Sequence, residues 1–361
     1  MSSPLIAVIG SLNTDLITRT NRIPAAGETL ISQAFATGSG GKGANQAVAC
    51  ARASRKKEAV KGIIDVRMEV AVGDDLFGQE LLEGLRNDGI NTENVAVKRG
   101  EKSGVAVILV EEQTGENRIL MSPNANFSLK PTDFAGLAAQ PPDLIVLQLE
   151  IPLDTTLQIL KIAQENKIEV LMNPAPAQRL PEEAYSAITH LIVNETEASI
   201  ITATKEEEAV WRRWGDHTET LVQLGVPHVT VTLGSQGVLY LDTVGEKVHI
   251  LGAEKVNVKD TTAAGDTFVG AYAVSIAQGK GKRNFKEMSN TISWANKAAA
   301  ITVQRDGAQT AIPWLNELPA STMDSIGNSW SFAEWKQRNG RCLHSGYNQT
   351  PSTETYQPVV I

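Results

Sequence analysis

Short apolar runs alternate with amphipathic stretches along most of the chain. Residues 5–9 form a continuous apolar run ended by Gly10, which is typical of a strand buried on both faces of a parallel sheet. From residue 143 onward the stretches DLIVLQLE, IEVLMNPAPA and ITHLIVNETEA predict strands, and a helix ending at Asn166 separates the first two. This regular alternation predicts an α/β fold with a doubly wound, mainly parallel sheet flanked by helices.

Other stretches alternate apolar and polar residues at period two. Residues 103–122 predict a β-hairpin around EEQTGEN, and residues 228–241 predict two strands joined through a turn at 234–237. Together with residues 15–40, the first hairpin would form a small sheet on the α/β body. Residues 70–90 predict a strand, a turn and an amphipathic helix ending at Gly89. The charged stretch 52–67 interrupts the rhythm and predicts a surface insertion.

The stretch DTTAAGDTFVGAY, residues 260–272, carries the most informative candidate chemistry of the chain. Val256 and Val258 alternate with polar residues as in a half-buried strand, and the apolar residues after it recur at helical spacing. Residues 263–266 therefore lie at a helix start, where free N–H groups and the helix dipole favour a phosphate. Asp266 could take a proton from a hydroxyl that attacks that phosphate. Alternatively, Asp266 merely caps the helix and Gly265 makes the turn.

Polar residues follow the first predicted strand directly, in GSLNTD. Ligands of open α/β sheets lie beyond the carboxyl ends of the strands, so Asn13 and Asp15 could hold the hydroxyls of a polyol. An Asx turn would explain the same residues.

Glycines recur in TGSGGKGANQAVACAR, residues 37–52, and they satisfy the spacing GxGxxG. A dinucleotide-binding loop requires a strand immediately before it, and ISQAFAT is a poor core strand. A phosphate-binding P-loop fails as well, because Gly43 stands where Ser or Thr is needed. The glycines permit close approach of the backbone to a ligand, with Lys42 and Asn45 at the start of a helix.

The amino-acid composition limits which partners the protein can bind and indicates its cellular compartment. With 361 residues, 42% hydrophobic and 20% charged, the chain can bury a full core, and one large domain with an appendage is expected. A net charge of -8 argues against nucleic acid and anionic membrane as partners. Two cysteines, and the absence of a signal peptide or long apolar window, predict a cytoplasmic protein, with a nuclear fraction left open.

The stretch DTTAAGDTFVGAY resembles the signature of the ribokinase (PfkB) family of carbohydrate kinases, and further motifs follow in family order over residues 5–318. The resemblance implies that Asp266 is the catalytic base and that Ala263, Ala264 and Gly265 form an anion hole. It implies a ribokinase-like fold with a small β-sheet lid and phosphorylation of D-ribose at its 5-hydroxyl by ATP, giving D-ribose 5-phosphate and ADP. The implied sugar-binding residues are Asn13, Asp15, Gly41, Lys42, Gly43, Asn45, Glu150 and Asp266.

The same resemblance implies nucleotide and cation sites. The expected ATP-binding residues are Asn194, Thr232, Gly234, Ser235, Gln236, Gly237, Gly265 and Asn296. Mg²⁺ is expected through water on Asn194 and Glu197, although an N-cap explains Asn194 equally well. The expected K⁺ loop comprises Asp260, Thr262, Thr302, Arg305, Gly307 and Ala311. Ala311 replaces a serine that bacterial ribokinases tend to have, so one ligand would be lost or replaced by water or Thr310.

The resemblance also predicts the domain organisation and the assembly. Residues 1–12, 41–97 and 126–320 would form the core, residues 13–40 and 98–125 the lid, and residues 321–361 a polar C-terminal extension outside the catalytic fold. A homodimer through the lid is expected.

Three alternatives compete with this interpretation. A sibling kinase would act on fructose, a nucleoside or another polyol. A sugar-binding regulator would keep the fold without catalysis, although Asp266 and the anion hole are intact. A dinucleotide-binding oxidoreductase would bind NADH, and the missing strand before the glycines argues against it.

Overall fold

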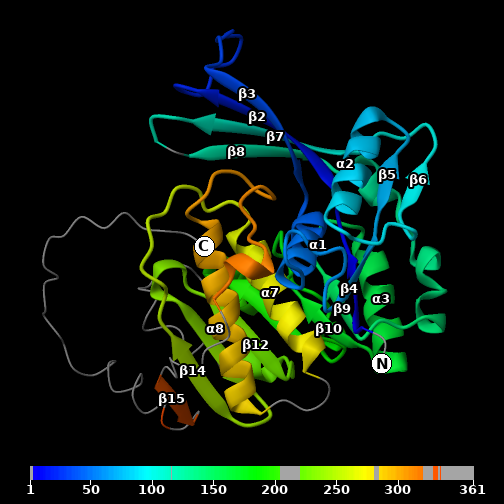
Figure 1. Ribbon diagram of the computed structural model, residues 1–361, viewed down its shortest axis with the longest axis vertical. Coiled ribbons are helices and arrows are strands. Elements are labelled where there is room, and N and C mark those ends of the chain that lie inside the picture. Colours follow the sequence, from blue (N-terminus) through cyan, green and yellow to red (C-terminus); the bar gives the residue numbers. More distant parts are fainter. Residues whose placement is uncertain are drawn as a thin grey trace, which may run out of the picture.

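A nine-stranded sheet forms the centre of the computed structural model, which describes residues 3–114, 116–203, 220–279, 284–319, 328–331 and 334 (Figure 1). The strands from β4 to β12 pair in parallel, and β13, β14 and β15 continue the sheet antiparallel. Across the sheet the order is β15 (Asn328–Ser331), β14 (Lys247–Leu251), β13 (Val238–Asp242), β12 (His228–Thr232), β11 (His190–Asn194), β10 (Glu169–Met172), β9 (Leu144–Leu147), β1 (Leu5–Ile9) and β4 (Asp65–Glu69). The predicted mainly parallel α/β sheet is confirmed.

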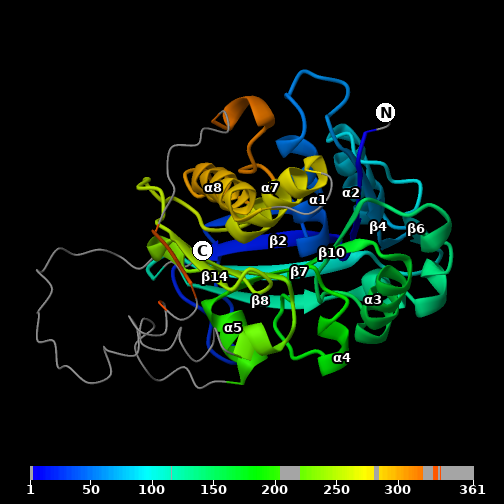
Figure 2. The same cartoon turned by 90° about the horizontal axis from the view of Figure 1, so that it is seen from below.

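Helices cover both faces of this sheet (Figure 2). One layer consists of α1 (Lys42–Ala53), α2 (Leu76–Asn87), α7 (Ala264–Gln278) and α8 (Phe285–Thr302). The opposite layer consists of α3 (Leu153–Asn166), α4 (Glu182–Tyr185) and α5 (Glu195–Thr202). Each layer packs its own cluster of buried apolar side chains on the sheet, which is why the central strands are apolar on both faces.

A second sheet of four strands projects from one end of the body (Figure 1). Its order is β3 (Ala34–Gly40), β2 (Asn13–Thr20), β7 (Gly104–Glu111) and β8 (Asn117–Ser122). At its base Asn13 pairs with Gly40 on one side and Gly104 on the other. The hairpin predicted over 103–122 is thus confirmed as β7 and β8.

Short elements complete the structure. β5 (Ala71–Gly73) and β6 (Ala96–Lys98) form a two-stranded parallel sheet. The 3-10 helices are η1 (Asn124–Ser128), η2 (Pro131–Phe134), η3 (Leu137–Ala139), η4 (Gly234–Gln236) and η5 (Leu315–Glu317). The turn predicted at 234–237 is confirmed, since η4 joins the antiparallel strands β12 and β13.

The surface insertion predicted over 52–67 is wrong at both ends. Helix α1 continues to Ala53, and β4 begins at Asp65 and pairs with β1, so only the residues between them form a loop. The charged residues of β4 made this segment look like a surface loop, although it is a strand of the core. Arg67 and Glu69 are buried, and their side chains pair with each other at 2.8 Å. The strand predicted at the start of 70–90 is β5, which lies outside the main sheet.

The strand predicted around Val256 and Val258 is also wrong. The chain from 252 to 263 has no regular structure, and Val258 is 38% exposed. Strand β14, which precedes this segment, already pairs with β13 and β15. No edge beside β14 is therefore open to the segment.

The polar extension is partly in the fold. Residues 328–331 form β15 and pair with β14, which contradicts the expectation that all of 321–361 lies outside the catalytic fold. Most of the remaining extension, including Cys342, lies outside the described residues. Cys50 is fully buried in α1, and burial raises the pKa of its thiol to about 12. None of the helices in the described ranges is long and apolar enough to cross a membrane.

Candidate active site

Asp266 lies in the first turn of α7, where the sequence places it. The helix begins after Ala263, which has a left-handed backbone with φ of +60° and forms no side-chain cap. The first N–H groups of a helix have no intrahelical acceptor. A Cβ added at Gly265 would meet nothing within 4 Å, so the space beside this turn is open. The turn can therefore accept an anion against its backbone.

Both carboxylate oxygens of Asp266 accept hydrogen bonds from amides of α1. Asn45 Nδ2 donates to Oδ2 and Gln46 Nε2 donates to Oδ1, each at 2.9 Å. Asp266 is 8% exposed, and its carboxylate accepts no hydrogen bond from the N–H groups of its own helix. The alternative in which Asp266 merely caps α7 does not describe this structure.

Glu150 lies just beyond β9 and binds the turn that follows β1. Its Oε2 accepts hydrogen bonds from the Ser11 hydroxyl and from the backbone N–H of Lys42 at 2.9 Å. Asn13 is also buried there, and its Oδ1 accepts a hydrogen bond from Asn126 Nδ2 at 2.8 Å. The predicted sugar-binding residues Asn13, Lys42 and Glu150 thus converge at the carboxyl ends of β1 and β9.

The charged side chains around Asp266 and Glu150 shift one another's pKa values. Burial, reinforced by the negative charges of Glu150 and Asp266, raises the pKa of Asp15 to about 7. Burial alone would lower the pKa of Lys42, but the negative charges of Asp266, Glu150 and Glu197 raise it. The four carboxylates and the lysine therefore share one electrostatic environment.

Gly41 and Gly43 approach the protein's own backbone, which differs from the expected reason for these glycines. Gly41 has φ of +88°, and a Cβ there would lie 3.0 Å from Asn13 N. A Cβ at Gly43 would lie 2.5 Å from Ser11 N. The glycines let the start of α1 pack on the turn after β1, and this places Lys42 and Asn45 beside Glu150 and Asp266.

Asn194 and Glu197 form a capping box at the start of α5. Asn194 Oδ1 accepts from Glu197 N at 2.8 Å, and Glu197 Oε2 accepts from Asn194 N at 2.9 Å. The capping alternative is confirmed. Burial, the largest effect on Glu197, raises the pKa of its carboxyl, with the charge of Asp266 adding to it.

The other nucleotide-side residues lie at strand ends and on α8. Thr232 ends β12, and the amides of Gln236 and Gly237 already donate within the following turn, to Leu233 O and Gly234 O. Ser235 and Gln236 are exposed. Asn296 on α8 is buried and donates to Gly252 O at 3.3 Å.

The segments of the expected cation loop meet around Asp260. Its Oδ1 accepts from Thr262 N at 2.9 Å and its Oδ2 accepts from Gly307 N at 2.9 Å. The Arg305 side chain is itself a cation and pairs with Glu317 at 2.7 Å, so only its backbone carbonyl could bind a cation. Ala311 is fully buried, and the Thr302 hydroxyl donates to the Thr267 hydroxyl at 2.9 Å. Among the described residues no group of three or more His, Cys, Asp or Glu could hold a metal ion.

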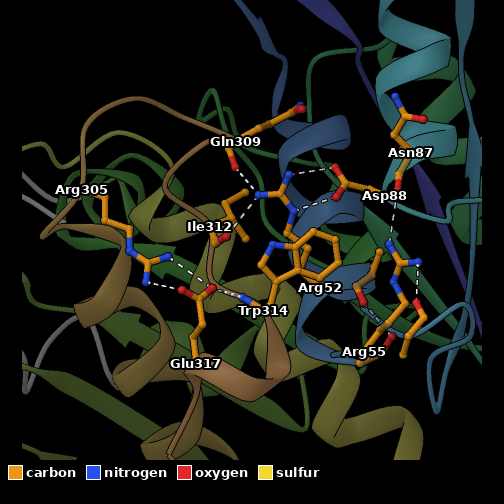
Figure 3. Close-up of polar contacts among 12 residues, drawn as sticks. Arg52, Arg55, Asn87, Asp88, Arg305, Gln309, Ile312, Trp314 and Glu317 are labelled. Atoms are coloured by element: carbon orange, nitrogen blue, oxygen red, sulfur yellow. Dashed lines mark hydrogen bonds and ion pairs between the residues drawn. The ribbon is translucent and has the colours of Figure 1, made fainter. Parts of the chain in front are cut away.

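The segment after α8 is fixed to α1 by Arg52 (Figure 3). Arg52 binds both carboxylate oxygens of Asp88, at 2.8 and 3.0 Å. It also donates to the carbonyl oxygens of Gln309 at 2.5 Å and Ile312 at 3.2 Å. Its guanidinium lies over the ring of Trp314, 4.9 Å from the centroid. The loop is thereby held beside Asn45.

Sequence reasoning missed several polar residues of the site. Ser11 binds Glu150, and Asn126 binds Asn13. Gln46 binds Asp266 directly, and three further amides bind Gln46 or Asn45. Several lie next to a predicted residue, as Gln46 follows Asn45 and Gln148 precedes Glu150 in QLE. The missed residues are Ser11, Gln46, Asn126, Gln148, Asn173 and Gln309.

Comparisons with known proteins place the chain in a family. Residues 3–315 match the family described as pfkB family carbohydrate kinase. The "Ribokinase" of Schizosaccharomyces pombe is 44% identical over 322 residues, covering 88% of this chain and 97% of that protein. The "Deoxyribokinase" of Salmonella typhi is 37% identical, covering 86% and 96%. The Arabidopsis thaliana ribokinase, solved with ribose and ATP, is similar with a TM-score of 0.75 and 28% identity, covering 88% of this chain and 97% of that one. The chain belongs to the pfkB family of carbohydrate kinases.

Proposed function

We propose that this chain transfers the γ-phosphoryl group of ATP to the 5-hydroxyl of D-ribose and releases D-ribose 5-phosphate and ADP. The observation that carries the proposal is Asp266, a buried carboxylate held by two amide donors in the open first turn of α7. A base and an anion site therefore coincide. The 44% identical ribokinase and the structure solved with ribose and ATP favour this acceptor and donor.

The chemistry follows from this position. Asp266 takes the proton of the 5-hydroxyl as that oxygen attacks the γ-phosphorus, and the bond to the bridging oxygen of ADP breaks. The N–H groups of Ala263, Gly265 and Asp266 would face the charge that moves onto the transferring phosphoryl oxygens. Their alignment by the helix means that little reorganisation is needed during the reaction. The N–H of Ala264, also expected in the anion hole, already donates to Thr261 O at 3.2 Å.

Ribose would lie between the end of the small sheet and α1. Asn13, Asp15 and Glu150 offer amide and carboxylate oxygens to its hydroxyls, with Lys42 and Asn45 on α1. Gly41 and Gly43 keep the backbone of that helix start close. Closure of the small sheet over the sugar would exclude water and disfavour ATP hydrolysis.

ATP would lie along Thr232, the turn from Gly234 to Gly237 (including Ser235 and Gln236), Asn296 and Gly265. Mg²⁺ would be held through water near Asn194 and Glu197, and it would neutralise phosphate charge. The cap bond uses Oε2 of Glu197, so its second oxygen can accept from a metal-bound water. The residues present fit such an indirect contact.

We also propose a monovalent-cation site at the loop of Asp260, Thr262, Thr302, Arg305 and Gly307. Hydrogen bonds already join Asp260 to Thr262 and Gly307, and carbonyl oxygens there suit K⁺. The methyl group of Ala311 supplies no oxygen. The Thr310 hydroxyl donates to Asp306 O at 3.0 Å, so a water would be the simpler replacement.

Apolar side chains on the small sheet support a homodimer through this lid. Phe35 is 62%, Ile119 53%, Leu120 69% and Met121 42% exposed. The strand register places Phe35 and Leu120 on one face of the small sheet and Ile119 and Met121 on the other. Either face therefore offers exposed apolar side chains to a second copy. The lid boundaries at 13–40 and 98–125 and a core of 1–12, 41–97 and 126–320 joined by β15 are part of the proposal. A cytoplasmic location completes it.

ADP release with Mg-ATP tests the acceptor, using D-ribose, 2-deoxyribose, D-fructose, adenosine and pseudouridine, each with and without K⁺. We expect D-ribose to give the highest kcat/KM. A higher value for 2-deoxyribose would move the assignment to the deoxyribokinase activity of the Salmonella relative. Ribose binding without turnover of any sugar would instead support a sugar-binding regulator.

A further inference from the structure

Each amide that binds Asp266 is itself oriented by another amide. We propose that Gln46 and Gln309, assisted by Gln148, are positioning residues that fix the Asp266 carboxylate for proton transfer. The inference rests on the proposed role of Asp266 as base. Gln46 has no exposed surface, so it acts through Asp266 without touching a substrate.

The first arm of this arrangement runs through Gln46. Gln46 Nε2 donates to Asp266 Oδ1 at 2.9 Å and to Asn173 Oδ1 at 3.0 Å. Gln46 Oε1 accepts from Gln148 Nε2 at 2.6 Å. A flipped Gln46 amide would place its oxygen against the carboxylate and its nitrogen against the Gln148 donor. The bond from Gln148 therefore holds the N–H end toward Asp266.

The second arm runs through Asn45. Gln309 Nε2 donates to Asn45 Oδ1 at 3.2 Å, and Asn45 Nδ2 donates to Asp266 Oδ2 at 2.9 Å. The Gln309 carbonyl is bound by Arg52, which is itself fixed by Asp88 (Figure 3). The loop of 305–314 is thus connected to the base through a single amide.

The two arms act on the two oxygens of one carboxylate. A carboxylate at a helix start can rotate about its side-chain bonds, and one donor would leave that rotation partly free. Donors on both oxygens restrict that rotation and fix the plane of the carboxylate. Proton transfer depends steeply on such alignment, whereas sugar binding does not.

Isosteric substitutions separate this role from packing. Gln46→Met removes the donor at nearly constant volume, and Gln46→Glu places an acceptor against Asp266. We expect kcat to fall about tenfold in Gln46→Met and about a hundredfold in Gln46→Glu, with the ribose KM changed less than about threefold, since a hydrogen bond to a charged group contributes about 1.5–3 kcal/mol. Gln309→Met should lower kcat about threefold to fivefold because it acts through Asn45.

A double-mutant cycle tests the link to Gln148. Gln148→Met should lower kcat in the wild-type background and have little further effect in Gln46→Met, because both changes remove one function. The matched control is Gln164→Met, which removes a glutamine hydrogen bond to Ser186 far from the site and should leave kcat unchanged. Isothermal titration with D-ribose provides a readout that does not depend on turnover.

The outcomes separate this inference from the proposed function. Wild-type kcat in both Gln46→Met and Gln309→Met, with Asp266→Asn inactive, would overturn the positioning role alone. An active Asp266→Asn would overturn the proposed base. If the Gln46 variants fail to fold, the partly exposed Gln309 still tests the second arm, and an unchanged kcat in Gln309→Met would then overturn the proposal.

Discussion

The proposed sugar side and the proposed nucleotide side of the site are built in opposite ways. On the sugar side, Asp266, Asn45 and Glu150 bind partners from segments far away in the chain, and Asn45 and Asp266 are 221 residues apart. On the nucleotide side, Asn194 and Glu197 bind each other three residues apart, and the turn after β12 binds itself. The sugar side is therefore pre-organised by tertiary contacts, whereas the nucleotide side consists of local motifs that a ligand would have to complete.

The largest effect is expected from the base itself. Asp266→Asn should lower kcat by about 10³ while D-ribose and ATP still bind, because a positioned base contributes about 10²–10⁴ in rate. Steady-state kinetics and titration of each ligand measure the two quantities separately. Loss of binding with retained turnover would contradict the assigned role.

The next largest effect is expected from Asp15, on the binding of ribose. Asp15→Asn should raise the ribose KM about tenfold or more and leave the ATP KM within about twofold, because only the sugar contact loses charge. The KM for each substrate measures the difference. Equal changes in both values would remove Asp15 from the sugar side and weaken the comparison.

The raised pKa of Asp15 also makes the free energy of unfolding depend on pH. The folded state binds its proton up to about pH 7, whereas the unfolded state releases it near 3.8. Stability therefore falls as pH rises between these values, and Asp15→Asn should relieve that loss. We expect the stability gain of Asp15→Asn, measured by denaturant unfolding without ligands, to grow by about 2 kcal/mol from pH 5 to pH 8. A gain that is independent of pH would contradict the assignment.

A smaller effect is expected on the nucleotide side. Glu197→Gln keeps an oxygen for the cap bond to Asn194 but removes the charge available to Mg²⁺-bound water. The Mg-ATP KM should rise about fivefold because the contact is indirect, with the ribose KM unchanged. Glu195→Gln, which lies outside the capping box, is the matched control. An unchanged Mg-ATP KM would leave Glu197 with a capping role only.

The smallest effect concerns the cation loop. Ala311→Ser restores a hydroxyl at a fully buried position and should lower the K⁺ concentration for half-activation about threefold, since one oxygen ligand is regained. Ala308→Ser adds the same group nearby as a control. Activity that is independent of K⁺ in every variant would end the cation proposal.

The sequence predicted the parts of the structure that local patterns encode. Continuous apolar runs identified β1, β9, β10 and β11, and helical spacing after Asp266 identified α7. Strand β4 was missed because Arg67 and Glu69 neutralise each other inside the core, and single letters do not reveal such a pair. The strand predicted around Val256 and Val258 was wrong because an alternating pattern forms a strand only where a neighbouring strand is free to pair with it.

The candidate site divides in the same way. Residues in motifs, such as Asn45 and Glu150, could be picked from the sequence because a family resemblance marked them. Gln46, Gln148 and Gln309 could not be picked from the sequence. Their role depends on hydrogen bonds between amides that only the folded chain brings together. For Asn194 the sequence offered a cap and a metal contact, and geometry confirmed the cap while the metal contact stays a prediction.

The row formed by Gly40, Asn13 and Gly104 has a mechanical consequence. Three of the chain crossings between the body and the small sheet pass through this row, beside the proposed sugar site. A Cβ at Gly40 would lie 2.2 Å from the Asp15 carboxylate, and one at Gly104 would lie 2.1 Å from Asn13 Oδ1. A movement of the small sheet as the proposed lid would therefore turn about this row. Because the row also borders the proposed sugar site, such a movement would shift Asn13 and Asp15 together with the sheet.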